Sequence, residues 1–343
     1  MNAITLEEHC LTQTALRATD PLRDAGLAPT YHDEGLKARL LDIGAGRIAD
    51  MDAAGIDYQV LSLVVCGVEL LKASEAVAVA HDVNEELGAS MRAYPTRFGA
   101  FATLALQDPE KAAAELEYCV NRLGFAGALI NGMTDGAFLD APRNTPVLEA
   151  AESLGVPIYI HPAPVPPAIR EIYFAGLPGH RGDLLSAGGW GWHSEVATQS
   201  LRLIASGALD RFPKLKLIIG HMGENIPFAL TRVDSILSNP DVNWSFTRTP
   251  QYGSFAPLKR RVGEYFRENF YITNSGFFTL PPLTLTMEVV GLDHLLFSID
   301  YPFISNMVGR TFLDTLAKQS SLSPEVLAKF SHLNAAKLLR IKA

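Results

Sequence analysis

Short runs of apolar and β-branched residues recur along the whole chain, and they restrict its fold more than any other feature. Several runs are almost wholly apolar, such as Leu217-Ile218-Ile219, which suits parallel strands covered on both faces. Stretches with helical character separate the runs, as in a parallel α/β fold. The eight runs are Ile4–His9, Tyr58–Val65, Phe98–Leu106, Ala126–Asn131, Pro157–His161, Leu215–His221, Phe270–Asn274 and Leu295–Asp300. We therefore predict a (β/α)8 TIM barrel.

A doubly wound parallel sheet is the alternative fold. The chain has no G-x-G-x-x-G after an early strand, and Gly44-Ala45-Gly46 lies in a helical stretch. No linker or internal repeat divides the sequence, so we expect one domain over residues 1–343, with insertions at about 10–37, 163–192 and 238–256. The first two follow strand ends and should border the active-site face of a barrel. The third follows a helix and has no predicted place.

Composition argues against several classes of partner. The net charge is −8 and the densest basic cluster is only Lys259-Arg260-Arg261, so we expect no nucleic-acid partner. We expect neither a signal peptide nor a membrane span, because no stretch reaches roughly 18 apolar residues. The three cysteines, Cys10, Cys66 and Cys119, lie far apart without a C-x-x-C pair. This pattern predicts reduced thiols in a cytoplasmic protein.

Charged and imidazole side chains gather where the predicted strands end. Side chains alternate along a strand, so Glu7 and His9 should share one face while Glu8 points the other way. His161 and Asp300 stand at the ends of two further strands. In a TIM barrel all these ends meet at the face that carries catalysis. Two carboxylates and two imidazoles suit zinc, manganese or iron, so these four residues are predicted to bind a divalent metal ion.

Other polar residues have more than one interpretation. His221 is either a further metal ligand or a general acid/base, and Glu224 either orients it or caps a helix. We expect a packing role for Cys66, which has no evident base partner. The remaining histidines are predicted to be structural, namely His32, His81, His180, His193, His294 and His332.

Four motifs in this order resemble the amidohydrolase superfamily. They are Glu7-Glu8-His9, Ile158-Tyr159-Ile160-His161-Pro162, Ile218-Ile219-Gly220-His221-Met222-Gly223-Glu224 and Phe297-Ser298-Ile299-Asp300-Tyr301-Pro302-Phe303. More narrowly they resemble its metal-dependent, non-oxidative decarboxylases, which act on γ-resorcylate, 2,3-dihydroxybenzoate, 5-carboxyvanillate or aminocarboxymuconate semialdehyde. The resemblance covers essentially the whole chain, including the connecting stretches.

The resemblance implies roles for individual residues. It implies Glu7, His9, His161 and Asp300 as metal ligands, with His221 and Glu224 beside the metal. It also implies Asn131 and Arg232 near the substrate. The hydrolases of the superfamily typically begin with H-x-H and often carry a metal-bridging lysine on strand 4. This chain has Glu7-x-His9, and Phe125–Asn131 contains no lysine, so one metal ion, zinc or manganese, is expected.

The implied activity is the non-oxidative decarboxylation of an ortho-hydroxylated aromatic acid, with Asp300 first and His221 second as proton donor. No organic cofactor is expected, because the substrate ring accepts the electrons. The alternatives are a mononuclear metal-dependent hydrolase of an amide, ester or lactone and a non-catalytic binding protein. The resemblance further implies a homodimer or homotetramer, and the Trp190–Trp192 segment offers aromatic surface suited to an interface. The loop over residues 10–30 has no aromatic side chain, and Tyr31 is the first after it.

Overall fold

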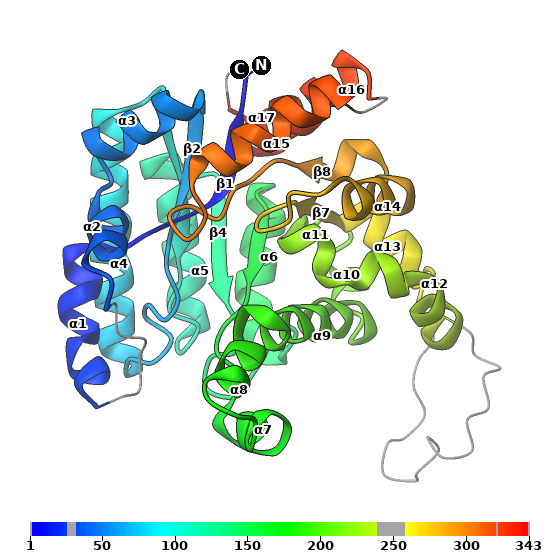
Figure 1. Cartoon of the computed structure of the whole chain (residues 1–343). Helices are drawn as coiled ribbons and strands as arrows, with labels where there is room; N and C mark the ends of the chain where they lie inside the picture. The colour runs from blue at the N-terminus through cyan, green and yellow to red at the C-terminus, as the bar shows by residue number, and fades with distance from the viewer. Residues whose placement is uncertain (1, 26–31, 239–257, 320–321, 342–343) are drawn as a thin grey trace, which may run out of the picture.

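The computed structural model describes residues 2–25, 32–238, 258–319 and 322–341. It contains one eight-stranded sheet in the order β1-β2-β3-β4-β5-β6-β7-β8, and every neighbouring pair is parallel. The strands are β1 (Ile4–Cys10), β2 (Tyr58–Leu63), β3 (Phe98–Thr103), β4 (Gly127–Asn131), β5 (Ile158–His161), β6 (Leu217–Ile219), β7 (Phe270–Thr273) and β8 (Leu295–Leu296). The predicted TIM barrel is confirmed (Figure 1).

Every strand except β1 is shorter than predicted, and β6 and β8 lose the most residues. The run to His221 ends at Ile219, because His221 has a φ of 51°, in the left-handed region that a strand cannot use. The run to Asp300 ends at Leu296 because the following backbone bonds to side chains. Ser298 N donates to Asn274 Oδ1 and Ile299 N donates to Glu8 Oε1, each at 3.0 Å.

Glu8 and Ser298 join β1 to the segment that follows β8. Ser298 Oγ accepts the N–H of Glu7 at 2.8 Å and donates to Glu8 Oε1 at 3.0 Å. The carboxylate of Glu8 also accepts the N–H groups of Ile299 and Tyr301. Glu8 therefore points away from Glu7 and satisfies backbone groups that would otherwise be unpaired. Burial raises the pKa of Glu8 to about 7, despite these hydrogen bonds.

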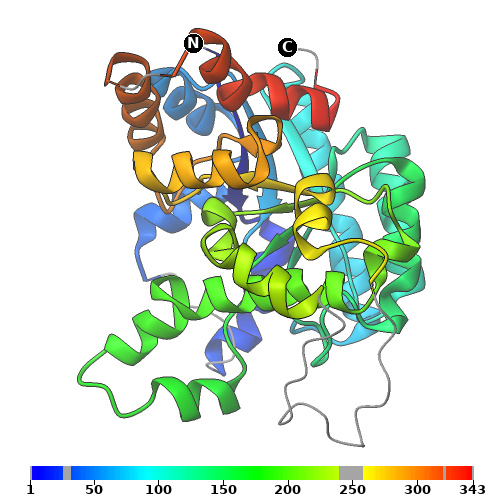
Figure 2. The same ribbon diagram turned by 90° about the vertical axis from the view of Figure 1, so that its right-hand side faces the viewer.

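The helices between the strands surround the barrel (Figures 1 and 2). They are α1 (Gln13–Asp24), α2 (Glu34–Leu41), α3 (Ala45–Ala54), α4 (Ala73–Ala93), α5 (Pro109–Tyr118), α6 (Thr145–Leu154), α7 (Pro167–Phe174), α8 (Arg181–Leu184), α9 (Gly191–Ala205), α10 (Ala208–Arg211), α11 (His221–Glu224), α12 (Ile226–Leu237), α13 (Val262–Asn269), α14 (Leu280–Val290), α15 (Asn306–Gln319), α16 (Pro324–Ala328) and α17 (Asn334–Leu339). Short helical turns are η1 (Cys119–Leu123), η2 (Pro142–Asn144), η3 (Leu185–Gly189), η5 (Leu292–His294) and η6 (Lys329–Leu333). No helix in the described ranges is long and apolar enough to cross a membrane.

Local sequence accounts for several helix ends. Asp108 caps α5 by accepting the N–H of Lys111 at 3.3 Å, and Pro109 occupies the first turn, where a missing N–H costs little. Gly155 ends α6 at a φ of 63°, which glycine adopts without a Cβ clash. The barrel interior is filled by alternate strand residues, including Leu6 and Phe101. A larger core lies between the strands and the helices.

Two of the three predicted insertions lie largely within the described residues. The first contains α1 and the start of α2. Tyr31, within this insertion, lies outside the described residues. The second contains α7, α8 and η3, which project beyond the barrel at the end opposite α16 and α17 (Figures 1 and 2). The third, at about 238–256, lies outside the described residues from position 239 onward. The α7–η3 projection follows β5 and therefore belongs to the carboxyl-end face of the barrel.

Candidate active site

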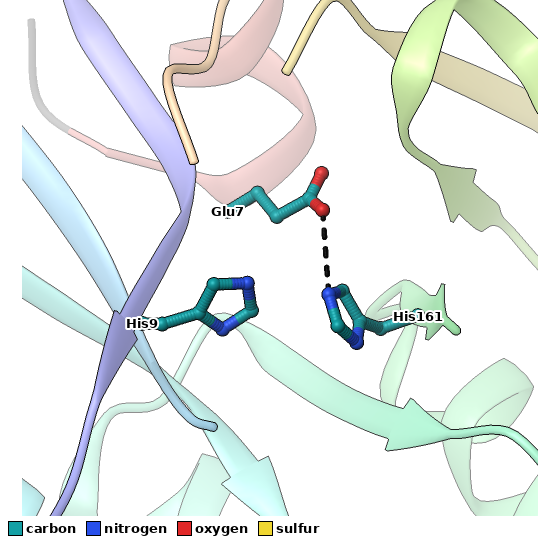
Figure 3. Close-up of side chains that lie close together, drawn as sticks. All are labelled: Glu7, His9 and His161. Carbon is teal, nitrogen blue, oxygen red and sulfur yellow. Dashed lines mark ion pairs between the residues drawn. The ribbon is translucent and has the colours of Figure 1, made fainter. Parts of the chain in front are cut away.

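Three of the four predicted metal ligands point toward one another. Glu7 and His9 extend from β1 and His161 ends β5, so the three side chains meet inside the barrel mouth (Figure 3). Each offers a ligand atom, and these atoms all lie within 4.8 Å of one another. Glu7 Oε1 is 3.5 Å from His161 Nε2. All three residues are buried.

Asp300 and His221 extend this group. Asp300 Oδ1 lies 3.5 Å from His9 Nε2, and His221 Nε2 lies 3.5 Å from Glu7 Oε1. Both residues have a left-handed backbone, with φ of 77° at Asp300 and 51° at His221. Such a backbone is costly for residues other than glycine and is typical of functional sites. The structure thus groups Glu7, His9 and His161, and places Asp300 and His221 at the border of this group.

The spacing of these atoms fits a shared cation better than hydrogen bonding. The N···O separations of 3.5 Å exceed the usual hydrogen-bond range of about 2.7–3.2 Å. Glu7 Oε1 is buried and accepts no hydrogen bond from the described residues. Two atoms bound to one tetrahedral ion at about 2.1 Å lie about 3.4 Å apart. An unpartnered carboxylate oxygen facing imidazole nitrogens at this distance is the arrangement that a metal ion would complete.

The pKa shifts of the group also fit a metal site. Burial, with His221 next, lowers the pKa of His9 to about 3, and burial holds the pKa of His161 well below its usual range. Both imidazoles are therefore neutral, which is the form that binds metal. Burial and the neighbouring Glu7 raise the pKa of Asp300 well above its usual range. Two carboxyl groups and two neutral imidazoles are a donor set that fits a divalent cation.

Hydrogen bonds fix the orientation of His161. Its Nδ1 lies 2.8 Å from Asn131 Oδ1, so this nitrogen donates and Nε2 keeps a lone pair toward Glu7. Asn131 Nδ2 donates in turn to Glu69 Oε1 at 2.6 Å. Asn131 was expected near the substrate, and both its side-chain polar atoms are engaged here. Glu69 was not predicted, because it stands in the loop after β2 and not at a strand end.

The other oxygen of Glu7 is held by hydroxyl groups. Tyr159 and Ser275 both donate to Glu7 Oε2, and Thr273 lies 2.8 Å from each of these hydroxyls. This set leaves only Glu7 Oε1 facing the imidazoles. Tyr159 is two residues before His161 on β5, so strand alternation could have predicted that it points into the barrel.

His221 is bound on its far side by Glu224. Its Nδ1 lies 2.7 Å from Glu224 Oε1. Of the two interpretations of Glu224, the structure favours orientation of His221. Burial on its own would lower the pKa of His221, but the carboxylates of Glu224 and Glu7 outweigh it and raise that pKa to about 10. Of the three imidazoles, His221 is thus the one whose surroundings favour a bound proton.

A second group of potential metal ligands consists of His193, His221 and Glu224. Here the N···O distances are 2.6 Å for His193 to Glu224 and 2.7 Å for His221 to Glu224. These are hydrogen bonds, and they leave no room for an ion between the atoms. The group around Glu7 is therefore the better candidate for a metal site.

Comparison with known proteins agrees with this geometry. The family model described as amidohydrolase matches residues 24–341. The chain belongs to the amidohydrolase family. A relative, γ-resorcylate decarboxylase of Polaromonas sp., is 39% identical over 307 residues, which is 88% of each chain.

Two solved structures are similar over nearly their whole length. One is a dihydroxybenzoic acid decarboxylase of Polaromonas sp. with bound manganese and the inhibitor 2-nitroresorcinol. It has a TM-score of 0.84 and 34% identity, with 100% of this chain and 98% of that chain covered. The other is 5-carboxyvanillate decarboxylase of Novosphingobium aromaticivorans, complexed with manganese and 4-hydroxy-3-methoxy-5-nitrobenzoic acid. It has a TM-score of 0.88 and 30% identity, with 98% and 96% covered. The predicted resemblance to metal-dependent decarboxylases is confirmed.

Other predicted residues of this amidohydrolase lie outside the buried group. Arg232 is exposed on α12. Cys66 is buried, and burial raises the pKa of its thiol to about 12, as expected of a packing residue. All three cysteines are free thiols.

Sequence reasoning also missed Glu195 on α9. Both its carboxyl oxygens are buried without a hydrogen-bond partner in the described part of the chain. It lies beside Gly132, directly after β4, where an added Cβ would meet Glu195 Oε1 at 3.1 Å. Burial, with Glu224 next, raises the pKa of Glu195 to about 8. Glu195 is therefore mostly protonated at neutral pH, so its carboxyl group adds little negative charge next to Glu224.

Proposed function

We propose that this protein is a metal-dependent, non-oxidative decarboxylase of an ortho-hydroxylated benzoic acid. The observation that carries the proposal is the set of neutral imidazoles and carboxylates around Glu7 Oε1, with two acid groups, Asp300 and His221, at its border. The γ-resorcylate decarboxylase relative supports the substrate class. The two similar solved structures are also decarboxylases, and each holds a hydroxylated aromatic compound.

We assign Glu7, His9, His161 and Asp300 as the metal ligands. Zinc and manganese both suit this donor set, and manganese is bound in both similar structures. When bound, the divalent cation supplies positive charge that holds the substrate's carboxylate and adjacent hydroxyl group in place. Asn131 and Arg232 remain candidates for substrate contact, Asn131 beside His161 and Arg232 on α12.

The chemical difficulty is the aryl carbanion that direct loss of CO2 would leave. A proton delivered first to the ring carbon that bears the carboxylate removes this difficulty. The carbon–carbon bond then breaks, its electron pair returns to the ring, and CO2 leaves with a phenol as the other product. Asp300 is our first choice as donor and His221 our second. The donor regains its proton from solvent, so no oxidant or reductant is consumed.

Aromatic side chains stand next to the group around Glu7. The ring centroid of Phe303 lies 5.7 Å from that of His9, and Phe277 lies 6.4 Å from His221. Phe303 is 47% exposed and so has a free ring surface. These residues follow β8 and β7, and they provide aromatic contact for an aryl acid that residues 10–30 lack.

A substrate panel tests the proposal. The metal-loaded protein is incubated with 2,6-dihydroxybenzoate, 2,3-dihydroxybenzoate, 5-carboxyvanillate and 4-hydroxybenzoate, and released CO2 is measured. Amides and lactones form the hydrolase arm, measured by acid release. CO2 from an ortho-hydroxylated acid, and none from 4-hydroxybenzoate, is the expected result. Cleavage of amides or lactones without CO2 from any acid would replace this function by hydrolysis.

We also propose that the protein forms a homodimer or homotetramer through the α7–η3 projection. This segment exposes large apolar side chains that a monomer would leave in water, with Ile172 74%, Tyr173 72% and Leu184 68% exposed. Light scattering at micromolar concentration should give two or four times the chain mass of 37.2 kDa. Ile172→Asp should shift the mass toward one chain, whereas Val308→Asp on α15 should not. A monomeric wild-type protein would contradict the proposal.

A further inference from the structure

His193 is a buried residue on α9 that the proposed mechanism does not use. Its Nδ1 lies 2.6 Å from Glu224 Oε2 and its Nε2 lies 3.0 Å from the carbonyl oxygen of Gly188. Both ring nitrogens thus face hydrogen-bond acceptors, and only a ring with two N–H groups donates to both at once. Its ring also packs edge-on against His221, with centroids 5.0 Å apart.

Glu224 therefore holds two imidazoles, one on each oxygen. Oε1 faces His221 Nδ1 at 2.7 Å and Oε2 faces His193 Nδ1 at 2.6 Å. The last torsion of a glutamate side chain is soft, so one hydrogen bond fixes the carboxylate plane poorly. A second bond from a buried partner fixes it well. The orientation of His221 Nε2 toward Glu7 thus depends on both contacts.

Gly188 connects the same chain of contacts to the barrel mouth. It belongs to η3, the last part of the projecting insertion after β5. The contacts run from the Gly188 carbonyl through His193 and Glu224 to His221. Phe277 packs against His193, with ring centroids 5.7 Å apart, and shields this chain.

We propose that His193 is a positioning residue for proton transfer, fixing Glu224 and through it His221, and tying both to the segment at the mouth. The proposal rests on the proposed function only in naming the reaction that His221 serves. The hydrogen bond from His193 to Glu224 positions Glu224, and the hydrogen bond from His193 to Gly188 holds His193 itself in place.

Two isosteric variants separate these contacts. In His193→Asn the amide nitrogen can replace Nδ1 and keep the bond to Glu224. In His193→Gln it replaces Nε2 and keeps only the bond to Gly188. We expect His193→Gln to lower kcat about 10–100-fold, the usual cost of losing such a partner, with KM changed less than about twofold. The kcat of His193→Asn should be at least about tenfold higher than that of His193→Gln. Equal kcat in both variants, or a loss confined to KM, would overturn the proposal.

A measurement without substrate keeps this test separate from the proposed function. In zinc-loaded protein labelled with ¹⁵N-histidine, the Nδ1–H resonance of His221 should shift in His193→Gln and stay near its wild-type position in His193→Asn. Melting temperature and zinc content identify any variant that is merely misfolded. An unchanged resonance in both folded variants would refute positioning. If the resonance responds but the wild type releases no CO2 from any hydroxybenzoate, the proposed function fails and the positioning role stands.

Discussion

Replacing Asp300 by asparagine is expected to lower kcat for decarboxylation roughly 10²–10⁴-fold, the usual contribution of a general acid. An amide has no proton to give to a ring carbon, although it keeps the shape of the carboxyl group. Asp300 Oδ1 lies 3.5 Å from His9 Nε2, so the variant also tests whether this acid belongs to the metal site. The rate of CO2 release should be measured at saturating metal, with bound metal quantified in the same sample.

A matched control is Asp293→Asn, because Asp293 forms an ion pair with Lys329 at the protein surface. It should retain wild-type kcat. If metal-loaded Asp300→Asn kept more than about a tenth of wild-type kcat, Asp300 could not be the proton donor. His221, whose Nε2 lies 3.5 Å from Glu7 Oε1, would then take that role.

Replacing His161 by alanine is expected to remove most of the bound metal. The neutral imidazole of His161 presents Nε2 to Glu7 Oε1 at 3.5 Å, and its Nδ1 is held by Asn131. Loss of a residue that supports a metal ligand lowers metal affinity by about 10–100-fold. Loss of the ligand itself should cost at least as much, so we expect the metal affinity to fall by about 100-fold or more. Elemental analysis after dialysis should find about one equivalent in the wild type and little in the variant.

The control for this experiment is His81→Ala. His81 is an exposed histidine that pairs with Glu115 on the outer helices, so its removal should leave the metal in place. Full occupancy in His161→Ala would contradict the ligand assignment. Loss of metal from both variants would point to general destabilisation and not to ligation.

The barrel and the positions of the central residues followed from local sequence signals. Parallel strands covered on both faces produce apolar runs, and a parallel sheet brings the ends of such runs to one face. Glu7, His9 and His161 could be placed together for this reason, without knowledge of any contact. Strand alternation also separated Glu7 from Glu8, which bonds to the backbone of Ile299 and Tyr301.

Residues held by tertiary contacts were harder to predict. His193 was expected to be structural, because nothing in the sequence shows that α9 passes beside Glu224. Its burial was predictable, since it shares one face of α9 with Val196, Ser200 and Leu203 at helical spacing. The function of that burial was not.

The ends of the strands were also hard to predict from the sequence. The apolar pattern of residues 295–299 continues past β8, but Ser298 and Ile299 donate their N–H groups to side chains. Periodicity reports which residues are buried and not which partner accepts each hydrogen bond. The left-handed backbone at His221 and Asp300 is likewise invisible to it.

The most direct test of the proposed function is decarboxylation of 2,6-dihydroxybenzoate in D2O. Protonation of the ring carbon by the enzyme predicts resorcinol with one deuterium at the carbon that bore the carboxylate, in step with CO2 release. Resorcinol kept in D2O without protein measures background exchange. Deuterium at that carbon in the first turnovers, above background, is the predicted result. Failure to release CO2, or release without deuterium at that position, would contradict the account.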